Sequence, residues 1–213
     1  METTNNLPSL FRSLRTSCHS PLISTAELER LILHDKALEN DTKGYRESIN
    51  IDRNEARNKK RKLPAICPSI QFRRTGRKLE DFGCATGWLM LDYDHVAEIG
   101  LDEKVEIASK SPYSMVVYRT ISGKGLRILL RYERPKGCTL TITELHRLAV
   151  DKAISIYDDL LHISADQQCK DMVRLCGLAH DAKAYFCWDS KPLTFSPDEV
   201  DWFYQHVVLK EQE

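Results

Sequence analysis

The sequence predicts an α+β protein in which helices pack against a largely antiparallel sheet. The expected elements run in the order helices, strand, helix, hairpin, helix, strands and helix, and a sheet covered by helices is the economical way to bury their apolar faces. The chain has 213 residues, of which 42% are hydrophobic and 29% are charged. These values are typical of one ordinary globular domain and exclude wholesale disorder.

The chain is expected to form one compact domain with two parts. Residues 1–62 form an N-terminal arm and a basic helical lead-in, and residues 63–213 form the core. Within the first part, residues 1–20 are rich in Ser, Thr and Asn and show no periodicity, so a loose arm is expected there. The sequence contains no internal repeat and no low-complexity tract.

Two helices are expected in the lead-in. Ser24 and Glu27 have the spacing of a capping box, which predicts a helix over 25–38. A second helix is expected over 45–61. The basic side chains in and just after its last turns are Arg53, Arg57, Lys59, Lys60, Arg61 and Lys62.

Short apolar runs separated by Gly or Pro follow the lead-in, and their composition suits strands. The last two are joined only by the segment from Arg119 to Gly125, which predicts a hairpin with a glycine-containing loop. A short helix is expected over 101–108. The four runs are Ile70–Phe72, Trp88–Tyr93, Tyr113–Tyr118 and Leu126–Tyr132.

The C-terminal part begins with the clearest periodicity in the chain. Apolar residues across 141–160 recur at helical spacing and predict a long helix. Strands are expected over 172–179 and 184–186. Ser196 and Pro197 then begin a closing helix, with proline at its first turn and acidic residues next to the positive end of the helix dipole.

The formal net charge is zero, because 31 basic residues balance 31 acidic ones. The balance hides a basic segment: residues 46–78 contain eleven Lys or Arg and three Asp or Glu. Such a segment beside an acidic body is typical of a protein that binds a polyanion. We expect the basic residues from Arg57 to Lys62, together with Arg73 and Arg74, to contact the phosphate backbone of a nucleic acid.

The seven cysteines are scattered and include no Cys-x-x-Cys pair. The N-terminus lacks a basic start followed by an apolar run, and no stretch approaches the roughly eighteen apolar residues of a membrane span. We therefore expect thiols in a reducing, cytoplasmic compartment and no membrane partner. Zinc binding is the alternative, although the spacing of the candidate ligands matches no close-ligand motif. Those candidates are Cys169, Cys176, His180 and Cys187.

The sharpest chemical feature is an acidic pair, Asp92 and Asp94, at the end of an apolar run. Because side chains alternate along a strand, the two carboxylates are expected on one face. Adjacent carboxylates repel each other unless a cation joins them, and hard divalent cations prefer oxygen ligands. The pair therefore predicts a Mg²⁺ or Mn²⁺ site completed by the phosphates of a nucleotide. A strand end that runs into solvent is the alternative.

The loop of the expected hairpin contains Ser122, Gly123, Lys124 and Gly125, and Arg127 follows two residues later. The glycines let backbone N–H groups turn toward a phosphate, while the hydroxyl, ammonium and guanidinium groups supply further donors. The loop lacks the first glycine and the final Ser or Thr of a P-loop. It is a candidate nucleotide-binding loop, and a plain β-turn is the alternative.

A third carboxylate, Asp166, follows the long helix, and Arg174 lies eight residues later in an apolar run. A buried arginine needs an anionic partner. That partner is either a protein carboxylate, such as Asp171, or a substrate phosphate, and the sequence leaves both open. Arg174 is therefore also a candidate nucleotide-binding residue.

From Tyr45 to Phe195 the chain resembles the VirE N-terminal domain family, a branch of the archaeo-eukaryotic primase and primase-polymerase superfamily. Domains of this family typically head replication proteins of mobile elements, often with a helicase part downstream. The residues that carry the resemblance match in order and spacing. They are Lys62-Leu63-Pro64-Ala65, Leu91-Asp92-Tyr93-Asp94, Ser122-Gly123-Lys124-Gly125-Leu126-Arg127, Asp166, Arg174-Leu175-Cys176 and His180-Asp181.

The resemblance implies a core with an RRM-like antiparallel or mixed sheet, in which three carboxylates bind two metal ions. Asp92 and Asp94 match the first motif of the family, and Asp166 matches the third. In active members the second motif is a serine-glycine loop that leads to a histidine. The serine and glycine are present here, but Arg127 stands at the histidine position. Arginine keeps its charge but cannot exchange a proton as histidine does.

The function that the resemblance implies is transfer of nucleotides onto a nucleic-acid primer. The three carboxylates would hold Mg²⁺ or Mn²⁺ ions roughly 3.5–4 Å apart. Lys124, Arg127 and Arg174 would bind the triphosphate of a nucleoside triphosphate. Single-stranded DNA or a primer/template is the expected second substrate, and a helicase domain or subunit is an expected partner.

Alternative functions stay open. A catalytically decayed module of the same fold would bind nucleotide or nucleic acid for a replication protein. A haloacid-dehalogenase-like phosphatase also uses Asp-x-Asp, but Gly or Thr usually follows its second Asp, whereas His95 follows here. Glycosyltransferases use Asp-x-Asp with Mn²⁺, but the glycine-containing loop has no clear role in them.

Overall fold

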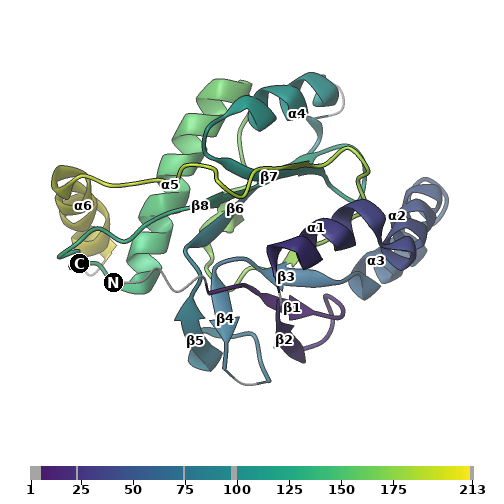
Figure 1. The fold of residues 1–213 in the computed structure, drawn as a ribbon, viewed down its shortest axis with the longest axis horizontal. Helices are drawn as coiled ribbons and strands as arrows, with labels where there is room; N and C mark the ends of the chain where they lie inside the picture. Colours follow the sequence, from purple (N-terminus) through teal and green to yellow (C-terminus); the bar gives the residue numbers. More distant parts are fainter. Residues whose placement is uncertain (1–5, 23, 74, 97–99, 212–213) are drawn as a thin grey trace.

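The structure, a computed structural model, describes residues 6–22, 24–73, 75–96 and 100–211. Its centre is a four-stranded sheet in the order β10-β7-β8-β6 (Figure 1). Each pairing in this sheet is antiparallel, which confirms the predicted α+β class with an antiparallel sheet. Its strands are β6 (Trp88–Tyr93), β7 (Ser114–Arg119), β8 (Leu126–Arg131) and β10 (Tyr185–Phe186).

The expected hairpin and long helix are both confirmed. β7 pairs with β8, and the apolar periodicity corresponds to α5 (Ile142–Leu161). α5 begins with a capping box: the Thr141 hydroxyl accepts a hydrogen bond from the Glu144 N–H, and the Glu144 carboxylate accepts one from the Thr141 N–H. α5 packs against β6, while α4 (Leu101–Lys110) packs against β7 and α5.

A second antiparallel sheet, in the order β2-β1-β3-β9, includes residues that were expected to form a loose arm. Leu10 pairs with Ile66, and the Phe11 side chain is fully buried. The expected arm over 1–20 is therefore wrong for its described part, because strands this short show no periodicity and depend on pairing with distant segments. The strands are β1 (Ser9–Phe11), β2 (His19–Pro21), β3 (Ala65–Cys67) and β9 (Cys176–Gly177), with β4 (Ile70–Phe72) and β5 (Phe82–Ala85) in a separate two-stranded sheet.

The strand expected over 172–179 is wrong except at Cys176–Gly177. The segment before β9 forms a turn instead. There the Asp171 carboxylate accepts a 3.1 Å hydrogen bond from the Val173 N–H, and the Asp171 carbonyl accepts a 3.0 Å bond from the Arg174 N–H. An acidic side chain that bonds to the nearby backbone competes with strand pairing.

The first helix begins at Thr25 with Ser24 as its N-cap, as predicted, but it ends at His34. The described part of the lead-in contains three helices where two were expected, so the predicted end at 38 and the extent 45–61 are wrong. Asp35 and Asp52 explain the difference. Each side chain accepts a hydrogen bond from a backbone N–H in the first turn of the following helix, and so begins a new helix at a position that the apolar pattern does not mark. The helices are α1 (Thr25–His34), α2 (Lys36–Ser48) and α3 (Arg53–Lys62).

The N-terminal helices share a hydrophobic core with the central sheet. Leu28, Ile32 and Leu38 lie in the same buried cluster as the strands β6, β7 and β8. In addition, β1 pairs with β3 across the expected boundary between residues 62 and 63. The two expected parts therefore pack together around one core.

The closing helix α6 (Pro197–Phe203) begins as predicted, with Ser196 as its N-cap and proline in its first turn. All seven cysteines are free thiols, as expected. Within the described ranges, no helix has the length and apolar character needed to cross a membrane. The remaining short helical segments are η1 (Leu79–Asp81), η3 (Gln167–Lys170), η4 (Tyr204–Val208) and η5 (Leu209–Glu211).

Candidate functional site

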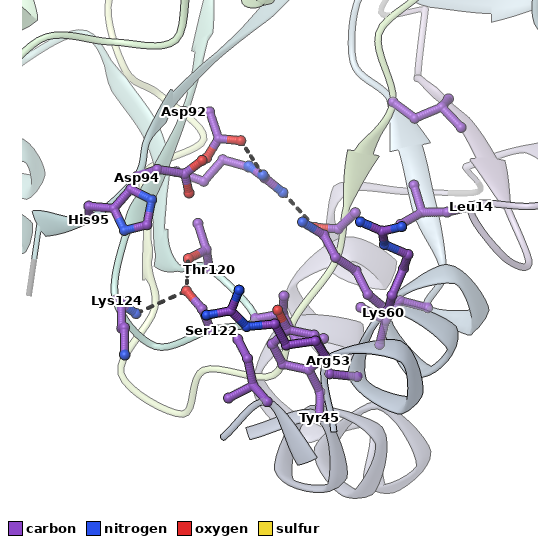
Figure 2. A pocket seen from close by; sticks show the side chains of 18 of the residues that line it. Leu14, Tyr45, Arg53, Lys60, Asp92, Asp94, His95, Thr120, Ser122 and Lys124 are labelled. Carbon is purple, nitrogen blue, oxygen red and sulfur yellow. Dashed lines mark hydrogen bonds and ion pairs between the residues drawn. The ribbon is translucent and has the colours of Figure 1, made fainter. Parts of the chain in front are cut away.

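A cavity of about 650 Å³ lies between the central sheet and the N-terminal helices. The end of β6 and the β7–β8 loop form one wall, α2 and α3 form the opposite wall, and the segment around β9 adjoins both. Figure 2 shows Asp92, Asp94 and His95 on the sheet side of this cavity, and Arg53 and Lys60 on the helical side. The cavity thus brings together segments that lie far apart in the sequence.

The acidic pair at the end of β6 lines this cavity, but its two members differ in environment. Asp92 belongs to the strand and is buried, with 6% of its surface exposed. Asp94 lies just beyond the strand and is exposed. Of the two, Asp94 is therefore the carboxylate that an incoming ligand meets first.

Asp92 forms a buried ion pair with Arg127, its direct neighbour in the β6–β8 register. Nη2 of Arg127 lies 2.5 Å from Oδ2 of Asp92, and Nη1 donates a 2.7 Å hydrogen bond to the Gly177 carbonyl. Burial disfavours the charged guanidinium, but the adjacent Asp92 carboxylate outweighs it and raises the pKa of Arg127 above its ordinary value. Arg127 is therefore a fixed positive charge beside Asp92.

Asp166 reaches β6 through its backbone and not through its side chain. Its N–H donates a 2.9 Å hydrogen bond to the Asp92 carbonyl. Its Oδ2 lies 2.7 Å from Nη2 of Arg174, and its Oδ1 accepts a 2.9 Å hydrogen bond from the Gln168 N–H. Arg174 lines the cavity and Asp166 does not. The anionic partner of Arg174 is thus Asp166 rather than Asp171.

The carboxylates do not fit the two-metal site that the resemblance implies. Arg127 holds one oxygen of Asp92, and the other, Oδ1, is buried without a hydrogen-bond partner among the described residues. Arg174 holds Asp166. Across the described part of the chain, no three His, Cys, Asp or Glu side chains lie close enough together to hold a metal ion, and this includes the candidate zinc ligands.

The β7–β8 loop is a turn whose backbone groups bond to one another. The Gly123 N–H donates a 2.8 Å hydrogen bond to the Thr120 carbonyl, and the Lys124 N–H donates one of 3.2 Å to Oγ of Ser122. These amides were expected to face a phosphate, but they are already bonded within the loop. Ser122 and Lys124 line the cavity, whereas Gly123 and Gly125 do not.

Helix α3 supplies a basic wall made of Arg53, Arg57 and Lys60. Their spacing of four and three residues places them on one face of the helix. Arg57 and Lys60 were expected to contact nucleic acid, whereas Arg53 was expected as a basic residue of the helix but not as a site residue. The helical spacing from Arg57 is the signal that could have found it.

Of the other basic residues expected to contact nucleic acid, those that the structure describes do not line the cavity. Lys59 joins α3 to α2 by donating a 3.1 Å hydrogen bond to the Gly44 carbonyl. Arg73 donates a 2.7 Å hydrogen bond from Nε to a backbone carbonyl. Arg74 lies outside the described residues. Two further side chains of this set are exposed away from the cavity, Arg61 and Lys62.

Two more residues at the site were not predicted from the sequence. Arg46 of α2 holds the loop in place by donating from Nε to the Ile121 carbonyl at 3.0 Å. His95 lines the cavity directly after Asp94, with a left-handed φ of 59°. No local pattern marks either residue, since their roles depend on which segments pack against them.

Among the residues that the structure describes, six basic side chains thus line one cavity with two carboxylates, and one carboxylate is already neutralised by an arginine. Guanidinium and ammonium groups form strong charge-assisted hydrogen bonds to phosphate oxygens. The arrangement therefore suits a ligand that carries several negative charges close together. The six basic residues are Arg53, Arg57, Lys60, Lys124, Arg127 and Arg174.

Over residues 58–186 the sequence matches the model of a family described as BT4734-like, N-terminal domain. The match covers more than half of the chain and includes β6, the β7–β8 loop, Asp166 and Arg174. Neither the curated proteins nor the solved structures contain a match to this sequence. The extent of the family match shows that the chain belongs to the BT4734-like N-terminal domain family.

Proposed function

We propose that this domain binds a nucleoside triphosphate and a nucleic-acid strand in the cavity, as a primase-polymerase-like module of a replication protein. The observation that carries the proposal is the convergence of six basic side chains on one cavity beside Asp92 and Asp94. A triphosphate concentrates several negative charges in a short span, so it interacts with several of these side chains at once.

The two walls of the cavity suit two different parts of such a complex. On the sheet side, Lys124 and Arg174 lie near the acidic pair and suit the triphosphate, while Arg127 is paired with Asp92. On the helical side, the basic wall of α3 suits the phosphate backbone of a nucleic-acid strand, because contacts to successive phosphates need no base recognition. The resemblance to the VirE N-terminal domain family supports this division, since it implies nucleotide and primer substrates for the same domain.

A second candidate function is transfer of a nucleotide onto a primer. The backbone hydrogen bond between Asp166 and Asp92 favours it, because it brings together the first and third motifs, which carry the three carboxylates. Bound Mg²⁺ or Mn²⁺ would supply charge neutralisation for the triphosphate. Against transfer, Arg127 and Arg174 would first have to release the two carboxylates that they hold. Binding is therefore the function that the geometry supports best.

A haloacid-dehalogenase-like phosphatase is not favoured. That class carries its Asp-x-Asp motif in a doubly wound fold, whose sheet is largely parallel. Here the strand that ends in the acidic pair, β6, lies at the edge of an antiparallel sheet and pairs only with β8 among the described strands.

Fluorescence anisotropy with a labelled single-stranded oligonucleotide tests the binding proposal. The Arg57→Gln/Lys60→Gln variant is expected to bind roughly tenfold more weakly than wild type, because two phosphate contacts are lost. The matched control, Arg61→Gln/Lys62→Gln, removes the same charge from the same helix outside the cavity and should bind within about threefold of wild type. Equal losses in both variants would show that general charge, and not the cavity, accounts for binding.

A primer-extension assay with Mg²⁺ or Mn²⁺ distinguishes binding from transfer. Asp94→Asn removes the exposed carboxylate of the cavity, which forms no ion pair with another described residue, and Asp159→Asn is its control on the exposed surface of α5. Extension that is lost in Asp94→Asn and kept in Asp159→Asn would establish transfer. Oligonucleotide and nucleotide binding without extension would establish a binding module.

A further inference from the structure

The ion pair between Asp92 and Arg127 bears on how a triphosphate enters the cavity. Carboxylates repel phosphate oxygens, and a divalent cation is the usual means of overcoming that repulsion. We propose that the Arg127 guanidinium takes the place of a divalent cation in neutralising Asp92, so that the cavity binds the triphosphate of a nucleotide without a metal ion. The inference rests on the proposed function and adds the chemical form of the substrate.

Several contacts fix the position of the Arg127 guanidinium, as its proposed role in place of a metal ion requires. The β6–β8 register places Arg127 opposite Asp92, and the Gly177 carbonyl accepts a 2.7 Å hydrogen bond from Nη1 of Arg127. The pair is largely buried, with 13% of the arginine side chain and 9% of the aspartate side chain exposed. Across the sheet Tyr118 is its register neighbour on β7, and the Tyr118 hydroxyl lies 3.1 Å from Sγ of Cys176. A cation fixed in this way needs no reorganisation when the ligand binds.

The charges on the cavity wall then favour an anion without added metal. With Asp92 neutralised, Asp94 is the one remaining carboxylate among the described lining residues, and five further basic side chains line the same cavity. Attraction of this kind is screened less in a partly enclosed cavity than on an open surface.

Asp166, like Asp92, is paired with an arginine. Arg174 lines the cavity and holds Asp166 through an ion pair of 2.7 Å. Both acidic residues that the backbone brings together are therefore matched by an arginine of their own. Arginine suits this role because it stays charged at any working pH and its planar fork binds two acceptors at once.

Isothermal titration of ATP into the full chain, once in EDTA and once in Mg²⁺, tests the inference. We expect dissociation constants that agree within about threefold between the two buffers. Binding that is roughly tenfold or more weaker in EDTA would overturn the inference and leave the proposed function in place. Absence of binding in both buffers would overturn both.

Single variants test whether ATP binding without a metal ion depends on Arg127. Arg127→Gln is expected to bind ATP roughly tenfold more weakly than wild type in EDTA, and Mg²⁺ should restore most of that loss by neutralising Asp92 in its place. Lys124→Gln, which removes a proposed triphosphate contact, should lose the same factor in both buffers. Arg131→Gln, on the same strand but outside the cavity, should bind as wild type. Equal losses of Arg127→Gln in both buffers would identify Arg127 as an ordinary phosphate ligand and refute the inference.

The single variant leaves a buried carboxylate without its partner, so a second variant guards against unfolding. Arg127→Gln/Asp92→Asn removes both charges. It should bind ATP in EDTA within about threefold of wild type, because no carboxylate remains to be neutralised at that position. Loss of ATP binding in EDTA by this double variant, with its fold verified by circular dichroism, would contradict the inference.

Discussion

Gly125 lies so close to β6 that a Cβ atom on it would be 2.3 Å from the carbonyl oxygen of Tyr93. The contact is with backbone, which cannot move aside as a flexible side chain can. Next to it, the Val96 N–H donates a 2.7 Å hydrogen bond to the Lys124 carbonyl. Together these contacts hold the β7–β8 loop against the end of the strand that carries Asp94.

We therefore expect Gly125→Ala to destabilise the domain. The added methyl group has no space, and such overpacking lowers the free energy of unfolding by about 1–3 kcal/mol. Gly44→Ala is the matched control: its Cβ would meet only the Lys59 side chain, no closer than 3.7 Å. In the interior of α2 that change should raise stability by about 0.5–1 kcal/mol. Urea denaturation measures both, and a Gly125→Ala variant as stable as wild type would disprove the close approach.

The buried ion pair predicts a large loss of stability when only one partner is removed. Arg127→Gln should lower the free energy of unfolding by about 3–5 kcal/mol, because it leaves the Asp92 charge buried without compensation. Arg127→Gln/Asp92→Asn should lose less than the single variant, since no buried charge remains. Urea denaturation of both proteins checks this order, and the reverse order would contradict a buried pair.

The basic wall of α3 predicts a change in the salt dependence of nucleic-acid binding. Each phosphate contact to a single strand contributes about 0.7 to the slope of log K against log salt concentration. The slope for Arg57→Gln/Lys60→Gln should therefore be shallower than that of wild type by about 1.4. Anisotropy titrations over a range of salt concentrations measure it. The slope should not change in Arg61→Gln/Lys62→Gln, and a change there would mean that the strand follows a different face of the helix.

His146 predicts a pH dependence of stability. It is buried in α5, its Nε2 has no hydrogen-bond partner among the described residues, and burial lowers its pKa to about 4, although the nearby Cys169 backbone acts in the opposite direction. The ordinary value is about 6.5, so between these pH values the unfolded chain binds more protons than the folded one. The stability that depends on neutral His146 is complete above about pH 6.5 and is lost as the pH falls toward about 4.

Urea denaturation near pH 7 and near pH 4 tests this dependence in wild type and in His146→Leu. The loss of stability on acidification should be smaller in the variant by about 2–3 kcal/mol. Contributions from carboxylates are common to both proteins and cancel in the comparison. Equal losses in the two proteins would show that His146 is not held neutral by burial.

The sequence by itself determined the elements whose signals are local. The apolar runs predicted β6, β7 and β8, and the helical period predicted α5, which Thr141 and Glu144 cap. The same alternation placed Asp92 and Asp94 together at a strand end, and both line one cavity. These features depend on residues a few positions apart, so the pattern of the chain is enough to predict them.

The tertiary structure alone decided which partners these residues have. Asp92 and Arg127 are 35 positions apart and meet only because of the β6–β8 register. Arg174 pairs with Asp166 rather than with Asp171, which is nearer in the sequence, because a turn directs its side chain there. The strand at Phe11 and the basic wall of α3 likewise depend on distant segments. Strand register and packing are set by burial over the whole chain, and no local pattern contains that information.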